Sequence, residues 1–274
     1  MRQVDRSSVN APRNLVNLTQ ANIRQLQNHT TISGAVYRHQ NVQDSLQELY
    51  FNKCYICECD VSDGYKVEHY LPKQFFPQLG YEWSNLHKSC EGCNLAKEHN
   101  DFFIRDATGN VVDIKLLDPS NQGYVISDYM RFNINSEAEL VSIGTDPVLI
   151  EKAKNTIKYL NGQYKNEYSK ELKYKRENKS KHFLIFFVNE LNGFRNIIEQ
   201  MNITGMDQYE APQNPAELNR HVQLCNKLIS LDLVYLSDRS PYSSCTRVSM
   251  VQILSMSYQS FVNMKERMRA TLGI

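Results

Sequence analysis

Two pairs of closely spaced cysteines constrain the fold of this chain more than any other feature. Cys54-Tyr-Ile-Cys57 and Cys90-Glu-Gly-Cys93 are CxxC pairs, and 32 residues separate them. A CxxC turn directs two thiolates at one ion, and two such turns complete the tetrahedral four-sulfur shell that zinc favours. The spacing therefore predicts a structural Zn²⁺ held by these four residues. Cys59 is a spare thiol beside the first pair, and it could replace Cys57 as a ligand.

The other cysteines and the apolar runs indicate where such a protein works. Seven cysteines are an odd number, and five of them lie between residues 54 and 93, which favours metal binding over a set of disulfides. The longest strongly apolar run, 183–188, is far shorter than the ~18 residues that span a membrane. Arg2 and Arg6 are followed by no apolar stretch, so a secretory signal is not expected. We expect a soluble, cytoplasmic protein.

Apolar residues recur at helical spacing before and after the cysteine-rich segment. One series predicts an amphipathic helix that leads to Cys54, and two others predict helical faces in the C-terminal part. Gly144-Thr145-Asp146-Pro147 predicts a helix start, with Thr145 or Asp146 as the cap. The three series are Val42, Leu46, Leu49 and Tyr50; Leu184, Phe187, Val188, Leu191, Phe194 and Ile198; and Met250, Leu254, Tyr258, Phe261, Met264 and Met268.

These patterns predict an α+β protein, in which a small zinc-braced module precedes a mainly α-helical C-terminal domain. An irregular arm and a short helix near residues 20–27 come before the module, and loops with short strands connect it to the helices. The predicted boundaries are 1–41 for the arm and short helix, 42–118 for the module, 119–146 for the connection and 147–274 for the helical domain.

Polar residues between and beside the cysteine pairs form a pattern with chemical meaning. Glu68-His69 is followed by Asn85 about sixteen residues later, and Asn94 directly follows the last of the paired cysteines. Taken singly, each is most simply a structural or surface residue. Together, over residues 50–101, they resemble the HNH endonuclease family, in the subclass braced by four cysteines. The resemblance implies a ββα-metal unit, with a strand ending at the histidine, a loop, a second strand and a helix.

Phosphodiester hydrolysis would give three of these residues distinct roles. His69 would be the general base, because a pKa near 6.5 lets an imidazole accept a proton at neutral pH. Glu68 and Asn94 would supply oxygen ligands to a catalytic Mg²⁺ or Mn²⁺, with Glu98 as an alternative to Glu68. Neighbouring side chains of a strand face opposite ways, so Glu68 and His69 can share a site only if the strand ends there, as Pro72 indicates.

Two further residues would support this site. The resemblance gives Asn85 the role of bracing the loop and orienting the histidine. Lys97 lies one helical turn after Asn94, where it would contact a phosphate oxygen. His87 and His99 do not match the motif, and we place neither in the site.

Softer motifs over residues 1–165 resemble a particular group of HNH proteins, the PtuB family of Septu and retron-linked phage-defence operons. They include Val4-Asp5-Arg6, Trp83, Leu117-Asp118-Pro119 and Gly144-Thr145. This resemblance implies a toxic nuclease acting on DNA or tRNA and held in check by an ABC-type ATPase, PtuA. A reverse transcriptase with its RNA–DNA product is a further partner that it implies. The alternative function is a zinc-braced interaction or scaffold subunit with an unused nuclease site.

Charge is unevenly distributed along the chain although its net value is only +1. Residues 152–181 hold ten basic and three acidic side chains, interleaved with tyrosines, a mixture typical of surfaces that follow phosphates and stack on bases. A solvated helix face, or one that docks on an acidic partner, explains the same pattern equally well. The predicted nucleic-acid contacts are Lys73, Lys173, Lys175 and Arg176.

Overall fold

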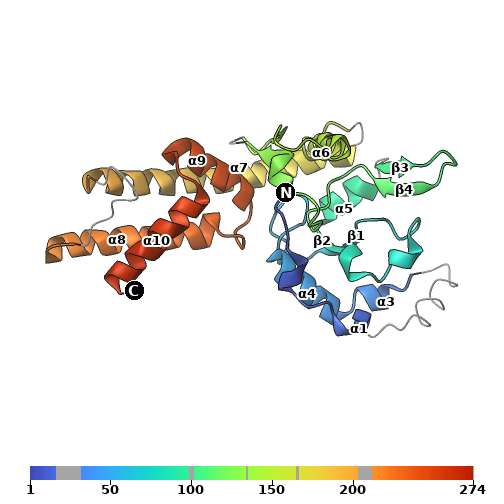
Figure 1. Cartoon of the computed structure of the whole chain (residues 1–274), viewed down its shortest axis with the longest axis horizontal. Coiled ribbons are helices and arrows are strands. Elements are labelled where there is room, and N and C mark those ends of the chain that lie inside the picture. The colour runs from blue at the N-terminus through green and yellow to red at the C-terminus, as the bar shows by residue number, and fades with distance from the viewer. Residues whose placement is uncertain (17–31, 99–101, 134, 165–166, 203–211, 274) are drawn as a thin grey trace. The chain divides into compact units, whose positions relative to one another are not determined.

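The computed structural model describes residues 1–16, 32–98, 102–133, 135–164, 167–202 and 212–273 (Figure 1). These residues form two compact units, one of residues 1–131 and 137–176 and the other of residues 132–136 and 177–274. The short helix predicted near residues 20–27 lies outside the described residues. The predicted domain boundaries stay predictions, because the division between the two units follows contacts rather than function.

The N-terminal segments of the first unit lead to the first cysteine pair. They comprise η1 (Arg6–Ser8), α1 (Arg13–Val16), α3 (Gly34–Tyr37) and α4 (Gln40–Tyr50). The predicted amphipathic face of α4 is buried, since all four apolar residues of its series are at most 2% exposed. The helix ends at Phe51, whose left-handed backbone (φ 49°) turns the chain toward Cys54.

A hairpin and a helix follow, and they carry most of the predicted site. Strands β1 (Lys66–His69) and β2 (Leu86–Ser89) pair antiparallel, with Glu68 opposite His87 and His69 opposite Leu86. Between them lie two short 3₁₀ helices, η2 (Pro77–Leu79) and η3 (Trp83–Asn85). Helix α5 (Glu91–Glu98) begins directly after β2. Strand β1 thus ends at the histidine, as the sequence predicted.

Short strands and one longer helix complete the first unit. Strands β3 (Phe103–Arg105) and β4 (Val111–Ile114) form a second antiparallel hairpin. After η4 (Ile126–Asp128), strands β5 (Met130–Phe132) and β6 (Ala138–Leu140) form a third two-stranded sheet. Helix α6 (Pro147–Leu160) is capped by Asp146, which accepts hydrogen bonds from the backbone N–H groups of Val148 and Leu149 at 2.8 and 3.2 Å. Of the two caps that the sequence offered, Asp146 is the one used.

The second unit is helical. It contains most of α7 (Glu167–Gln200), then α8 (Pro215–Leu231), the π-helical turn η6 (Asp232–Leu236), α9 (Ser243–Leu254) and α10 (Tyr258–Leu272). The apolar series near the C-terminus is divided between α9 and α10, because Ser255 adopts a left-handed conformation (φ 54°) and Ser257 caps the next helix. Side chains at the centre of this unit include Phe187, Leu191, Phe194, Leu224, Leu228, Phe261 and Met268.

The fold class is therefore mixed α and β, with small hairpins near four clustered cysteines and a helical C-terminal part, as predicted. None of the helices in the described ranges is both long and apolar enough to cross a bilayer.

Candidate functional site

The four paired cysteines meet at one point. The sulfur atoms of Cys54, Cys57, Cys90 and Cys93 all lie within 4.8 Å of one another, and Cys57 Sγ lies 3.8 Å from Cys90 Sγ. Four sulfurs at ~2.3 Å from one tetrahedral zinc are about 3.8 Å apart, so this spacing fits the metal. The first pair follows α4 and the second opens α5, so a zinc held here joins these two helices.

The spare thiol is not among the four. Cys59 is buried and its thiol contacts those of Cys54, Cys57 and Cys90, but its sulfur is not among the four that all lie within 4.8 Å of one another. Its backbone carbonyl accepts a hydrogen bond from the N–H of Cys54 at 3.0 Å, which closes the turn that carries the first pair. The arrangement therefore favours Cys57 over Cys59 as the ligand.

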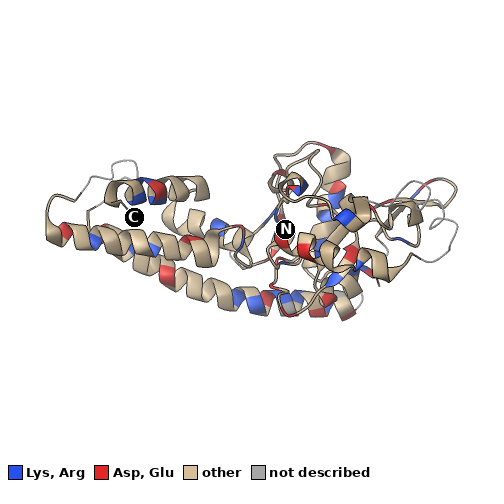
Figure 2. Ribbon diagram, turned by 90° about the horizontal axis from the view of Figure 1, so that it is seen from below, with Lys and Arg blue, Asp and Glu red and all other residues tan. Residues whose placement is uncertain are grey.

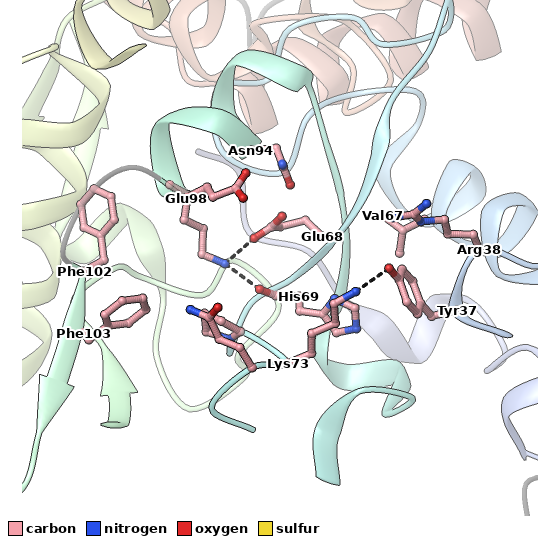
Figure 3. Close-up of a pocket in the computed structure, with 13 residues that line it drawn as sticks. Tyr37, Arg38, Val67, Glu68, His69, Lys73, Asn94, Glu98, Phe102 and Phe103 are labelled. Carbon is pink, nitrogen blue, oxygen red and sulfur yellow. Dashed lines mark hydrogen bonds and ion pairs between the residues drawn. The ribbon is translucent and has the colours of Figure 1, made fainter. Parts of the chain in front are cut away.

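A pocket of about 350 Å³ lies next to the hairpin and α5 (Figure 3). It collects most of the side chains that the motif singled out, although they come from a strand, a loop and a helix. Side chains that line it include Glu68, His69, Lys73, Asn94, Lys97 and Glu98, together with Tyr37, Arg38, Phe102 and Phe103.

The imidazole of His69 is buried at one wall of this pocket. Its Nε2 lies 2.9 Å from the carbonyl oxygen of Gly80. A carbonyl oxygen only accepts, so Nε2 carries the proton in this contact and Nδ1 keeps the lone pair of the neutral ring. Burial lowers the pKa of His69 to about 4, and the Tyr37 ring packs against it with 4.7 Å between ring centres. At neutral pH the ring is therefore an uncharged base.

Lys97 connects the end of β1 to α5. Its Nζ donates to Glu68 Oε1 at 2.6 Å and to the backbone carbonyl oxygens of His69 and Tyr70 at 2.6 and 2.9 Å. An ammonium has three N–H donors, so these three partners use them all. Lys97 is only 5% exposed, and it holds Glu68 and the histidine backbone on the same side of the pocket.

Three oxygen-bearing side chains lie close together in the pocket. Asn94 and Glu98 are one turn apart on α5, and Figure 3 shows their ends and that of Glu68 turned toward one another. In the described part of the chain, the Asn94 side chain makes no hydrogen bond, so its carbonyl oxygen is available to a ligand. Such a set of oxygens suits a hard divalent cation.

Asn85 holds the loop between the two strands. Its Oδ1 accepts from the backbone N–H of Leu71 at 2.7 Å, and its Nδ2 donates to the carbonyl oxygens of Leu71 and Leu79 at 3.0 and 3.2 Å. Its own carbonyl oxygen accepts from the N–H of Tyr70 at 2.9 Å. These bonds fix the chain directly after His69 and directly before Gly80. His69 and Gly80 are the two residues that the imidazole–carbonyl hydrogen bond connects.

The four predicted nucleic-acid contacts lie in different surroundings. Lys73 lines the pocket, donates to the Tyr37 hydroxyl at 2.7 Å and lies 4.6 Å from the centre of that ring. Lys173 is half-buried on α7, and the side chain of Lys175 is not among those that the structure describes. Arg176 is 2% exposed, so its guanidinium does not share a solvent-facing surface with the lysines. In the sequence of the first half of α7, basic positions predominate and acidic ones lie among them, and Figure 2 colours the two kinds blue and red.

His87 is a buried structural residue next to the site. Its Nδ1 lies 2.7 Å from the Tyr50 hydroxyl, and Arg6 Nη2 lies 3.3 Å from its Nε2. Because a guanidinium only donates, Nε2 is the acceptor and Nδ1 carries the proton. Arg6 also donates to the carbonyl oxygens of Trp83 and Leu86 at 2.8 and 2.7 Å.

Segments far apart in the sequence meet at this histidine. The N–H of Val4 donates to the carbonyl of Pro119 at 2.8 Å, and Asp118 Oδ1 lies 3.8 Å from His87 Nε2. The softer motifs at residues 4–6, at Trp83 and at residues 117–119 therefore surround one point behind β2.

Tyr37 and Gly80 were missed by sequence reasoning. Both act on His69, the first through its ring and the second through its carbonyl oxygen. Neither belongs to a local motif, and both reach the histidine only through the tertiary fold. The sequence therefore carries no local signal for either residue.

Comparison with known proteins gives one informative match. A stretch of 97 residues is 38% identical to the Septu protein PtuB of Bacillus thuringiensis, and it covers 34% of this chain and 36% of that protein. The chain therefore matches little more than a third of the length of this relative. No family model matches the sequence. The resemblance to PtuB that the sequence predicted is confirmed.

Proposed function

We propose that this chain is a metal-dependent HNH endonuclease that hydrolyses phosphodiester bonds in DNA or tRNA. The observation that carries the proposal is the pocket in which the uncharged imidazole of His69 and the oxygens of Glu68 and Asn94 come together. In this proposal β1, β2 and α5 form the ββα-metal unit, and the four-cysteine zinc braces it.

The histidine supplies the base. With Nε2 bound to the Gly80 carbonyl, Nδ1 is the atom that accepts the proton of the attacking water. The depressed pKa keeps the ring neutral at pH 7, which is the form that a base needs. Asn85 acts indirectly, because it fixes the loop that positions both the histidine and Gly80.

The oxygen ligands complete the site. Glu68 and Asn94 would hold a Mg²⁺ or Mn²⁺, and when bound this ion supplies charge neutralisation at the phosphate. Glu98, on the same helix as Asn94, is the further carboxylate in reach. We place Lys97 as a positioning residue, because its three donors are used by Glu68, His69 and Tyr70. In this arrangement it has no donor left for the phosphate contact that the sequence suggested.

The similarity to PtuB supports a role in phage defence. We propose that the chain is the nuclease subunit of a Septu-like system and that an ABC-type ATPase of the PtuA kind controls it. A reverse transcriptase with its RNA–DNA product is proposed as a further partner. Nucleic acid would be bound by Lys73 at the pocket and by Lys173 and Lys175 on α7.

Purified protein tests the proposal. It is incubated with Mg²⁺ or Mn²⁺ on plasmid DNA and on tRNA, alone and after co-expression with an ABC-type ATPase of the PtuA kind. We expect cleavage that His69→Ala abolishes and that His182→Ala, which changes an exposed histidine on α7, leaves intact. Cleavage that survives His69→Ala would exclude this histidine as the base.

One observation favours the second candidate function, a scaffold subunit with an unused site. The carboxylate of Glu68 is already neutralised by Lys97, as in a site that needs no divalent ion. Binding of Mn²⁺ to zinc-loaded protein, followed by its electron paramagnetic resonance, separates the two functions. A nuclease binds Mn²⁺ in a manner that Asn94→Ala weakens, whereas the scaffold binds none at this pocket.

A further inference from the structure

Two phenylalanines and an arginine lie together at the edge of the pocket. The ring centres of Phe75 and Phe103 are 4.8 Å apart at an interplanar angle of 69°. The guanidinium carbon of Arg105 lies 5.9 Å from the centre of Phe75 and 5.7 Å from that of Phe103. We call these three residues the aromatic ledge.

The ledge is continuous with the candidate site. Phe103 lines the same pocket as His69 and Asn94, and Figure 3 shows its ring beside that of Phe102, on the side of the pocket away from Tyr37. Phe75 comes two residues after Lys73, which also lines the pocket. A group stacked on the ledge would therefore lie next to a phosphate bound in the pocket.

The hairpin of β3 and β4 holds Arg105 in place. The register shifts between Ile104 and Arg105, and such an irregularity re-aims a side chain. Arg105 Nη1 donates to the carbonyl oxygen of Gly109 at 3.0 Å. The turn is closed by Asp106, whose Oδ1 accepts from the N–H groups of Thr108 and Asn110 at 2.9 and 3.0 Å. The ledge is thus presented by a well-bonded hairpin.

The aromatic ledge is more exposed than an aromatic cluster of the protein core. Phe75 is 37% exposed, Phe103 is half-buried and Arg105 is exposed, whereas the neighbouring Phe102 is buried against Tyr159 and Tyr164. Exposed aromatic faces with an arginine beside them are the surface on which unpaired bases stack, because every base has a π-face and a guanidinium adds a cation–π contribution. In a duplex the base faces are covered by their neighbours.

We propose that the aromatic ledge stacks on a base beside the scissile phosphate, so that the preferred substrate is an unpaired strand. This inference rests on the proposed nuclease function and adds the class of its substrate. It predicts that the protein selects single-stranded over double-stranded nucleic acid of the same sequence.

The test measures binding without cleavage. Full-length, zinc-loaded His69→Ala protein is titrated into an oligonucleotide that carries one 2-aminopurine, either single-stranded or annealed to its complement. Stacking quenches 2-aminopurine fluorescence, so we expect quenching and tighter binding with the single strand. Adding Phe103→Leu, which keeps an apolar side chain but removes the π-face, should weaken single-strand binding at least about fivefold and remove the quenching. Adding Val112→Ala, on the same hairpin, should change neither the single-strand binding nor the quenching.

Several results would overturn the proposal. They are single-strand binding and quenching that Phe103→Leu leaves unchanged, equal binding of both oligonucleotides, and no binding of either. If Phe103→Leu lowers the melting temperature, Phe75→Leu and Arg105→Gln replace it with the same expectations. If cleavage by the otherwise unaltered protein depends on His69 but not on Phe103, Phe75 or Arg105, this inference alone is refuted. If the His69→Ala protein quenches the single strand but the unaltered protein cleaves no substrate, only the nuclease function is refuted.

Discussion

Replacing Lys97 by methionine tests how the pocket is held together. The substitution keeps most of the side-chain volume but removes an ammonium that donates to Glu68 Oε1 and to two backbone carbonyl oxygens. The side chains of Lys97 and Glu68 are 5% and 15% exposed, so the pair is largely out of water. Removing one partner of a buried pair costs about 3–5 kcal/mol, because the other charge stays buried without compensation. We expect Lys97→Met to lower the free energy of unfolding by about 3 kcal/mol, since Glu68 keeps some access to solvent.

The tryptophan at position 83, the only one in the sequence, gives the assay. It lies in η3 within the first unit, so its fluorescence in urea reports the unfolding of that unit. Lys66→Met is the control, because its ion pair with Glu91 at 3.7 Å is exposed and should contribute less than about 1 kcal/mol. Adding Glu68→Gln to Lys97→Met should restore part of the loss, because the unpaired charge is then gone. A cost for Lys97→Met no larger than that of the control would refute the reasoning.

Three further predictions concern the parts that surround the pocket. Cys57→Ser should lose the bound zinc, measured by metal analysis of purified protein, and with it the fold of the first unit, whereas Cys59→Ser should keep one zinc per chain. Burial holds the pKa of His87 well below its ordinary value, so the unfolded chain takes up its proton first as the pH falls. The contribution of His87 to the free energy of unfolding should therefore be level above pH ~6.5 and decrease below it by up to about 1.4 kcal/mol per pH unit. Because the buried His69 adds to the total slope in the same way, His87→Gln should reduce that slope but not remove it in urea titrations at several pH values. Asn85→Ala should cost about 2–4 kcal/mol, because it leaves buried backbone groups of the loop without partners, and a cost below 1 kcal/mol in the same assay would contradict the bracing role.

The four-cysteine cluster was predictable because its geometry is local. Two residues between paired cysteines fix the direction of both thiolates, and the fold has only to bring two such turns together. The end of β1 at His69 was predictable for the same reason, since Pro72 limits the strand from a few residues away. The sequence narrowed the cap of α6 to Thr145 or Asp146, and the structure uses Asp146.

The hydrogen-bond partners and the burial of these residues could not be predicted from the sequence, because tertiary contacts determine them. Lys97 was expected to face the substrate from its position on α5, but the carbonyl groups at the end of β1 come within reach of it. The proton position on His69 depends on Gly80, eleven residues away. Arg176 belongs to a run of basic residues, and no property of that run distinguishes the one that is buried.

Helix α5 makes the zinc site and the pocket parts of one structure. Cys93 and Asn94 are adjacent on it, and Lys97 follows within one turn. The Tyr159 hydroxyl of α6 donates to the carbonyl oxygen of Cys93 at 2.5 Å, so the helix is also fixed from its other side. If the four clustered cysteines hold zinc, two of its ligands anchor the first turn of α5, and we expect loss of the metal to displace the asparagine and the lysine together. Divalent ion binding at the pocket should therefore require zinc, whereas zinc binding should be insensitive to Asn94→Ala.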